Sequence, residues 1–313
     1  MTRNNQVGAQ AINAAPTEKR KRRRYKKEDV IWGLLFGGLP LVGLLIFTMI
    51  PAVMAFAMTV LDMPKFFSFD GATFIWFENF ATVLKDETFW SSLKNNLILI
   101  VSVPVSIVIS VICAEVISKG LPGTKVFKLI LFIPYVCSVT ATTLMWQEIF
   151  DANHGVMNQI LGLNGFNWLD ADHLMWTVVI MTVWSSTGYR ILLFTAAITN
   201  VNASLKESAQ LDGANFIQVF THITIPAITP TIFYVLVMGT MGSLQEFTRI
   251  QIISWTAKDG LCLTGVFYIY REAFQYTNVG VACAASLVLT AIIVLITRLH
   301  FYLSKKWVSY EVA

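Results

Sequence analysis

The chain has 313 residues, of which 55% are hydrophobic and only 13% charged, and its mean hydropathy is +0.62. Soluble domains carry about a quarter charged residues, whereas here the charges gather near the N-terminus and between long apolar stretches. This composition excludes an ordinary soluble protein and is typical of a chain that crosses a membrane several times.

Residues 1–29 form a basic tail with nine Lys or Arg side chains, six of them consecutive at 19–24. A basic tract can bind nucleic acid. This one directly precedes an apolar segment, which favours attachment to anionic membrane lipid and argues against nucleic acid. The apolar run at 30–61 is much longer than the h-region of a signal peptide, about 7–15 residues, so we expect a retained helix.

Six windows are long and apolar enough to cross a bilayer, which takes about 20 mostly apolar residues. They are residues 31–61, 95–117, 126–150, 174–199, 227–247 and 278–303. Pro40 and Pro51 predict a kink or tilt in the first window, and Pro104 and Pro134 predict interruptions in the second and third. We therefore predict an all-α, polytopic membrane protein with six transmembrane helices, in which residues 30–313 form one transmembrane domain.

The Lys and Arg residues lie mainly on one side of this predicted topology. The tail, the 118–128 interval and the C-terminal end are basic, whereas the 151–173 loop has no Lys or Arg. The 62–94 loop has three basic residues against five acidic ones. Because cytoplasmic loops carry the excess of Lys and Arg, we expect both termini in the cytoplasm.

The cytoplasmic interval at 200–226 carries the most informative motif. Its pattern predicts two short helices that meet at Gly213, which can adopt the left-handed backbone that such a corner requires. Ser208, Ala209 and Asp212 keep the first helix small enough for another protein to approach. An apolar stripe at helical spacing on the second helix can pack onto the bundle: Phe216, Val219, Phe220 and Ile223. By composition alone, an ordinary amphipathic connector fits equally well.

This interval resembles the EAA loop of ABC importer permeases, whose pattern is E-A-A, three residues, G, nine residues, I-x-L-P. Five residues stand at matching positions: Glu207, Ala209, Gly213, Ile223 and Pro226. Ser208 and Ile225 are mild replacements for the first Ala and the Leu. We call residues 200–226 the EAA-like loop.

Further segments resemble carbohydrate permeases of the maltose type, over about residues 30–311. They are the stretches at 184–189, 245–247 and 268–271. The basic N-terminus and the ending at 307–311 resemble the first permease subunit of such systems. Residues 256–260 depart from the family's T-x-G-G-P-like turn, so that outer loop is expected to contact its partner differently.

The resemblance implies a type I ABC importer transmembrane fold and a permease subunit that forms half of a sugar or oligosaccharide pathway in a prokaryotic cell membrane. Implied partners are a second permease subunit, two ATPase domains and an extracytoplasmic solute-binding protein. No GxxxxGK[ST] motif occurs, so ATP and Mg belong to the ATPase, and we expect no cofactor on this chain. The resemblance assigns ATPase coupling to Glu207, Ser208, Ala209, Asp212, Gly213, Ala214, Ile223 and Pro226.

Polar residues at membrane depth are candidates for the pathway, because sugar sites combine aromatic faces with hydroxyl and amide groups. We expect a pathway lined by Gly188, Tyr189, Arg190, Ser243, Gln245 and Glu246, although simple packing stays open for each. Arg190 and Glu246 lie about 15 Å apart in depth by helix rise, which argues against a direct ion pair. Asn95 and Asn96 fit hydrogen bonding between helices better.

Two other classes of membrane protein remain as alternatives. A membrane-embedded enzyme would need converging catalytic or metal-binding side chains, but the four histidines are scattered and the four cysteines have no CxxC spacing; we expect no catalytic or metal site. An ATP-independent carrier or channel often has two similar halves, and no clear internal repeat is present. Neither class explains the EAA-like loop. The choice of sugar stays open, with Arg190 weakly favouring an acidic one.

Overall fold

The computed structural model describes residues 27–63, 69–120, 122–163, 165–256 and 264–309. Most of the basic tail therefore lies outside the described residues, as does most of the 256–260 segment. The chain divides into two compact units, Met1–Val53 and Met54–Ala313. Apart from one two-stranded pairing, the described secondary structure is helical, which confirms the all-α prediction.

The chain begins with α1 (Lys27–Leu44), the π-helical turn η1 (Leu45–Met49) and α2 (Ile50–Met58). The second unit continues with β1 (Leu61–Asp62), β2 (Thr73–Phe74), α3 (Glu78–Lys85), α4 (Glu87–Ile100), α5 (Ser102–Ser118), α6 (Thr124–Val136), α7 (Val139–Ile149), α8 (Val156–Leu161) and α9 (Leu174–Thr199). Then come α10 (Ala203–Leu211), α11 (Phe216–Val219), η2 (Phe220–Thr224), α12 (Ile225–Ala227), α13 (Thr229–Leu244), α14 (Thr248–Thr256), α15 (Gly265–Tyr270), η3 (Arg271–Gln275) and α16 (Val279–Ser304).

Within the described residues, four helices are long and apolar enough to cross a membrane, and the number rises to six if each of two bent helix pairs counts as one span. The first span, Ile31–Met58, buries only 6% of its most apolar window inside the chain. A helix that is apolar all round is stable where lipid or another protein covers it. Its hydrogen bonding changes to a π-helix directly before Pro51, since proline lacks an amide hydrogen and crowds the preceding turn.

The two bends also lie near prolines. The α6–α7 pair turns by 97° just after Pro134. The other pair, Phe216–Ala227 and Thr229–Ser254, turns by 64°. This second break falls at Ile228, because Pro230 has no amide hydrogen to donate to the Pro226 carbonyl. The hydroxyl of Thr229 donates to that carbonyl instead, at 2.7 Å, so the carbonyl keeps a hydrogen-bond donor.

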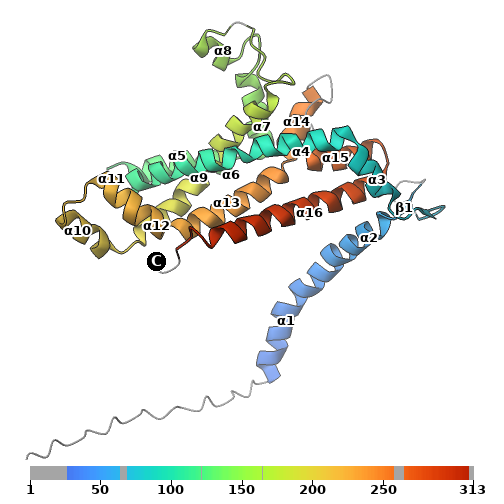
Figure 1. The fold of residues 1–313 in the computed structure, drawn as a ribbon, viewed down its shortest axis with the longest axis horizontal. Helices are drawn as coiled ribbons and strands as arrows, with labels where there is room; N and C mark the ends of the chain where they lie inside the picture. Colours follow the sequence, from blue (N-terminus) through green and yellow to red (C-terminus); the bar gives the residue numbers. More distant parts are fainter. Residues whose placement is uncertain (1–26, 64–68, 121, 164, 257–263, 310–313) are drawn as a thin grey trace, which may run out of the picture. The chain divides into compact units, whose positions relative to one another are not determined.

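Among the described residues of the second unit, buried apolar side chains form three clusters, and α9 belongs to the two larger ones, here called the two cores. The first half of α9, from Leu174 to Met181, packs in a core with residues of α3, α4, α14, α15 and α16. Its second half contributes Phe194 and Ile198 to another core with α5 and the start of α13. Figure 1 shows α5 running along α9, and α13 contacts both α9 and α16. The stretch of α9 between the two cores is therefore available for polar residues.

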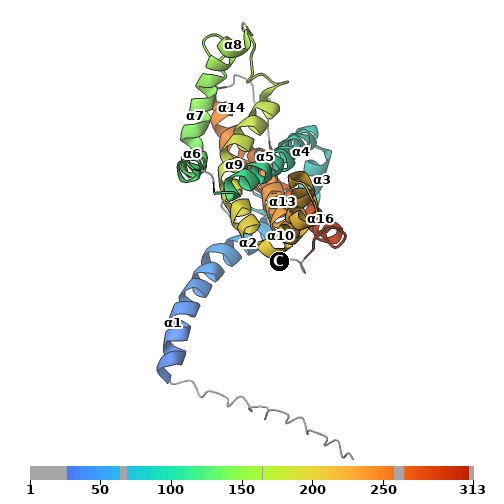
Figure 2. The ribbon, with the colours of Figure 1, turned by 90° about the vertical axis from the view of Figure 1, so that its left-hand side faces the viewer.

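Figures 1 and 2 show α10 and α12 near the chain's C-terminal end, at the end of the second unit away from α3. The C-terminal segment is held there by a hydrogen bond from the Ser309 amide to the Thr229 hydroxyl, at 3.0 Å. The ring of Trp307 also packs edge-on against Phe233, with centroids 6.1 Å apart. The EAA-like loop and the C-terminal segment are thus anchored at the same end of α13.

Asn96 holds the opposite end of α13. Its amide nitrogen donates to the carbonyls of Ser243 and Leu244 at 2.9 and 3.1 Å, and its oxygen accepts from the Gly265 amide at 2.7 Å. The side chain is completely buried on α4. These bonds satisfy backbone groups that the end of α13 leaves open, which confirms the expected interhelical hydrogen bonding of Asn96.

Candidate functional site

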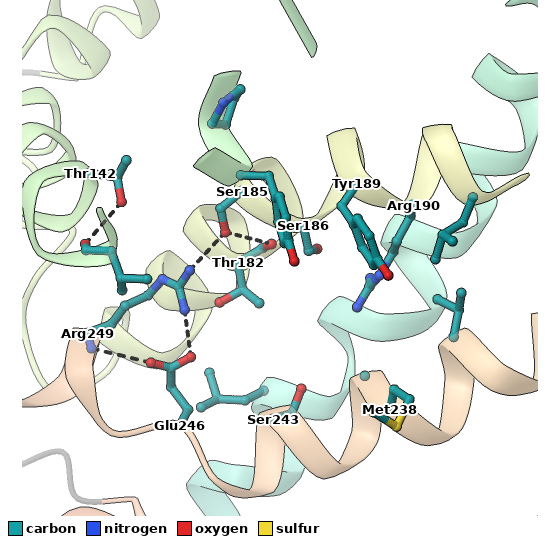
Figure 3. Close-up of a pocket in the computed structure, with 18 of the residues that line it drawn as sticks. Thr142, Thr182, Ser185, Ser186, Tyr189, Arg190, Met238, Ser243, Glu246 and Arg249 are labelled. Atoms are coloured by element: carbon teal, nitrogen blue, oxygen red, sulfur yellow. Dashed lines mark hydrogen bonds and ion pairs between the residues drawn. The ribbon is translucent and has the colours of Figure 1, made fainter. Parts of the chain in front are cut away.

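A cavity of about 470 Å³ lies in the second unit between the two apolar cores. This volume falls in the range of small-molecule sites, about 300–1,000 Å³. Its polar and aromatic lining comes from α6, α7, α9, α13 and the start of α14 (Figure 3). The lining includes Tyr135, Thr142, Thr182, Ser185, Ser186, Tyr189, Arg190, Tyr234, Ser243, Glu246 and Arg249.

Four of the six expected pathway residues line this cavity: Tyr189, Arg190, Ser243 and Glu246. Gly188 and Gln245 are not among the described lining residues. Gln245 is exposed at the C-terminal cap of α13, where its amide donates to the Met241 carbonyl at 3.2 Å. The structure therefore brings four of the six predicted pathway residues together around one cavity, from α9 and from the end of α13.

Gly188 instead brings two helices into close contact. A Cβ at this position would lie 1.8 Å from the Leu131 carbonyl oxygen on α6, so only glycine allows the two backbones to approach this closely. One residue further along α9, Tyr189 stacks on Tyr135 of α6 with ring centroids 4.7 Å apart and planes 14° apart. The glycine thus sets the aromatic wall of the cavity without lining it.

Glu246 is paired with Arg249, not with Arg190. The Arg249 Nη1 donates to the Glu246 carboxylate at 2.6 Å, and both side chains are largely buried. The Arg249 Nη2 donates to the Ser185 hydroxyl on α9 at 2.9 Å. Arg249 was not among the residues predicted for the site. Its position three residues after Glu246 could have indicated an ion pair, because side chains at this spacing are neighbours on a helix.

Arg190 is 8% exposed, and its Nη1 has no hydrogen-bond partner among the described residues. A guanidinium stays charged in proteins, so this is a buried charge without a carboxylate from the described chain beside it. A Cβ on Gly239 of α13 would lie 2.9 Å from the Arg190 Nη2. The glycine on the facing helix therefore leaves room for this side chain.

The EAA-like loop folds as two short helical segments with a sharp corner, as expected. Asn202 caps α10 by accepting from the Ser204 amide at 3.0 Å. At the corner, Gly213 has φ of +87°, the left-handed conformation that glycine adopts without strain. Asn215 and Gln218 then form a reciprocal capping box that starts α11, a device that satisfies two free amides at once.

The coupling residues predicted in this loop differ in how far their side chains are exposed. Glu207, Ser208, Asp212 and Gly213 are exposed, whereas the remaining members are half-buried: Ala209, Ala214, Ile223 and Pro226. An open concavity of about 380 Å³ is formed by Ala209, Asp212, Gly213, Ala214, Gln218, Val219, His222 and Ile223. The loop therefore presents an open concavity at its Gly213 corner.

Two features of this loop were not expected. Leu211 is 90% exposed, so an apolar side chain projects from the end of α10. Phe216 does not bury against the bundle with the rest of its stripe: it is half exposed, and the Lys119 ammonium lies 3.6 Å from its ring centroid. Val219 is buried, and Phe220 and Ile223 pack on the second core. The cation–π contact links the loop to the end of α5.

Among the described residues, no group of three or more His, Cys, Asp or Glu side chains is arranged to hold a metal ion. His154 of the 151–173 loop lies 2.9 Å from Asp151 and 3.4 Å from Glu148 at the end of α7. Two backbone amides donate to Asp151 and hold its pKa below the usual value. This arrangement is an ordinary capped turn.

Comparison with known proteins places the chain among membrane transport components. Residues 97–309 match the family described as "Binding-protein-dependent transport system inner membrane component". The chain is 32% identical over 302 residues to the probable ABC transporter permease protein YesP of Bacillus subtilis, covering 93% of this chain and 96% of that one. It is 31% identical over 243 residues to the arabinooligosaccharides transport system permease protein AraP of the same organism, covering 74% and 76%.

A solved structure has a similar fold. It is the bacterial alginate ABC transporter in complex with an alginate pentasaccharide-bound periplasmic protein. A chain of that complex superimposes with a TM-score of 0.74 at 25% identity, covering 89% of this chain and 96% of that chain.

Proposed function

The chain belongs to the family of binding-protein-dependent transport system inner membrane components, and on this premise we propose that it is the permease subunit of an ATP-binding-cassette importer for a sugar or oligosaccharide. It is a multi-pass inner membrane protein and not itself an enzyme. In this proposal the chain forms half of the translocation pathway and takes its substrate from an extracytoplasmic solute-binding protein.

The observation that carries the proposal is the cavity between α9 and α13. Its lining combines tyrosine rings with hydroxyl groups, among them Ser185, Ser186 and Ser243. Sugars present apolar ring faces edged by hydroxyl groups, so they bind where aromatic faces and hydrogen-bonding side chains converge. Two of the proteins named above, AraP and the alginate transporter, have names that refer to arabinooligosaccharides and alginate, which supports a saccharide without selecting one.

The partners follow from the family and from what the chain lacks. The family description names a dependence on a binding protein, and the alginate transporter was solved with its periplasmic protein. No GxxxxGK[ST] motif is present in the sequence, so ATP and Mg must be bound elsewhere. We infer a second permease subunit and two ATPase domains as the remaining parts of the complex.

We assign ATPase coupling to the EAA-like loop. Glu207 is exposed there and is available for charge-assisted hydrogen bonds to a docked protein. The exposed Leu211 side chain supplies an apolar anchor on the same short helix. The left-handed corner at Gly213 then fixes the direction in which α10 leaves α11.

The coupling role requires the EAA-like loop to face the cytoplasm together with both termini. The distribution of Lys and Arg supports this orientation. A reporter enzyme fused after Leu205 should therefore show cytoplasmic activity, and one fused after Asn167 should show external activity. External activity of the Leu205 fusion would contradict both the topology and the docking role.

Reconstitution of the whole importer in proteoliposomes tests the proposed function directly. Uptake of a radiolabelled oligosaccharide should require ATP, the ATPase and the solute-binding protein together. Equal uptake without ATP and ATPase would identify an ATP-independent carrier or channel instead. Chemical change of the sugar without net uptake would favour a membrane-embedded enzyme.

A further inference from the structure

The unpaired charge of Arg190 is the feature of the cavity that an uncharged sugar leaves unexplained. The side chain is more than nine-tenths buried, and its Nη1 finds no partner among the described residues. Removing a charged group from water is costly unless an opposite charge or hydrogen-bond acceptors replace the water. A group that lines a binding cavity in this condition is prepared for a ligand that supplies the missing acceptor.

The charges that line the cavity do not cancel. The described lining holds three ionisable groups with a full charge at neutral pH: Arg190, Glu246 and Arg249. Glu246 and Arg249 neutralise one another at 2.6 Å, and Arg249 is further occupied by the Ser185 hydroxyl at 2.9 Å. The cavity therefore keeps one net positive charge, and that charge is on Arg190.

The position of Arg190 is suited to recognising one end of a ligand. In Figure 3 its guanidinium points from α9 into the space facing α13, with Ser185 and Ser186 between it and the Arg249–Glu246 pair. Arg190 lies five positions after Ser185 on α9, which is about 7.5 Å along the axis. Hydroxyl groups thus extend away from the free charge over roughly the length of a sugar ring, and Tyr189 lies directly beside it.

We propose, building on the proposed function, that Arg190 binds an oxyanion on the transported saccharide, so that the preferred substrates are acidic sugars carrying a carboxylate or a phosphate. The guanidinium supplies donors that match a carboxylate or phosphate oxygen. The serine and tyrosine hydroxyls bind the neutral remainder of the molecule. A neutral saccharide leaves the buried charge unpaired and binds more weakly.

The test uses the assembled complex of both permease subunits and the ATPase in lipid nanodiscs, without the solute-binding protein, so that the selectivity of that protein does not interfere. Affinity is measured from the ligand-dependent rise in the unfolding temperature. The probes are digalacturonate, the size-matched neutral galactobiose, galactose 6-phosphate and inorganic phosphate. We expect digalacturonate or galactose 6-phosphate to bind at least tenfold more tightly than galactobiose, and the two acids distinguish carboxylate from phosphate.

Variants at Arg190 show whether this side chain is responsible. Arg190→Gln should weaken binding of the acidic probe by roughly ten- to a hundredfold, as expected for the loss of a charged partner, with little change for galactobiose. Arg190→Lys keeps the charge and should retain the preference for the acid. Arg298→Gln, which removes an exposed charge on α16 outside the cavity, should bind every probe as the wild type does.

Three results would overturn the inference. One is equal affinity of the wild-type complex for digalacturonate, galactose 6-phosphate and galactobiose. Another is an equal effect of inorganic phosphate, which would mean that an ion and not a saccharide is recognised. The third is a lower ligand-free unfolding temperature of Arg190→Gln, because a carboxylate of the second permease subunit would then pair with Arg190. Failure of ATP-dependent uptake would contradict the proposed function separately, since these binding measurements require no transport.

Discussion

The left-handed corner at Gly213 gives the sharpest test of coupling through the EAA-like loop. Its φ is +87°, and a Cβ added there would meet no atom within 4 Å. A substitution therefore acts only through backbone strain and not through a clash. Alanine in this conformation costs about 1–2 kcal/mol, whereas asparagine tolerates it better. Proline is held near a φ of about −65° and cannot adopt the corner at all.

These costs predict a graded loss of coupling. About 1–2 kcal/mol corresponds to a roughly five- to thirtyfold lower population of the docking-competent corner. Uptake by reconstituted importers should fall in the order Gly, Asn, Ala, Pro at position 213. Proline also removes the amide that donates to the Gln210 carbonyl at 3.1 Å, so its loss should be the largest. ATP hydrolysis stimulated by the binding protein should fall in parallel with uptake.

Gly162 is a matched control for the strain itself. It has φ of +67°, also has no atom within 4 Å of an added Cβ, and ends the short helix α8 in the 151–173 loop. Gly162→Ala should carry a similar conformational cost but leave the ATPase coupling intact. Wild-type uptake and hydrolysis in the Gly213→Pro importer would refute the reasoning. An equal loss of coupling in both alanine variants would also refute it, since strain and not docking would then explain the effect.

Two further predictions concern the second unit. Gly188→Ala should separate α6 from α9, because its Cβ would lie 1.8 Å from the Leu131 carbonyl oxygen; overpacking costs about 1–3 kcal/mol, and an unchanged thermal unfolding temperature would contradict it. Burial alone would raise the pKa of Asp86, but its hydrogen bonds, first of all that from the Tyr268 hydroxyl at 2.6 Å, lower it overall. A lowered folded-state pKa stabilises the protein above the unfolded-state value of about 3.9, and this contribution is lost as pH falls through the folded-state value. Asp86→Asn should therefore reduce the acid dependence of thermal unfolding, and an unaltered dependence would show that the bond does not matter.

Much of the fold could be predicted from the sequence because membrane spans depend on local composition. The continuous spans and the corner at Gly213 follow from apolar length and from the conformational freedom of one residue. The first bend could only be located approximately. The second break was not predicted. Its position depends on the Pro226 carbonyl, which loses its backbone donor at Pro230 and accepts from the Thr229 hydroxyl instead.

The site was predicted less completely, for a different physical reason. Whether Gly188 lines a pathway or contacts another helix depends on which group lies beside it. That group is the Leu131 carbonyl of α6, and its proximity cannot be predicted from the sequence. Helix rise correctly argued against Arg190 as the partner of Glu246, but it could not identify Arg249, because the break after α13 brings that side chain onto the carboxylate. Long-range packing decides both cases.

The connection between the EAA-like loop and the cavity is covalent and short on both sides. α9 supplies Tyr189 and Arg190 to the cavity and ends at Thr199, only a few residues before α10 begins at Ala203. On the other side, α12 ends at Ala227 and α13 begins at Thr229, and α13 supplies the facing wall. By helix rise, Arg190 lies about 15 Å from the C-terminal end of α9. A displacement of the EAA-like loop must therefore be taken up by both walls of the cavity, because packed helices move as stiff elements and not as continuously deformable ones. A movement of α9 and α13 would therefore also move Arg190, which carries the unpaired charge on α9, relative to Gly239, which leaves room for it on α13.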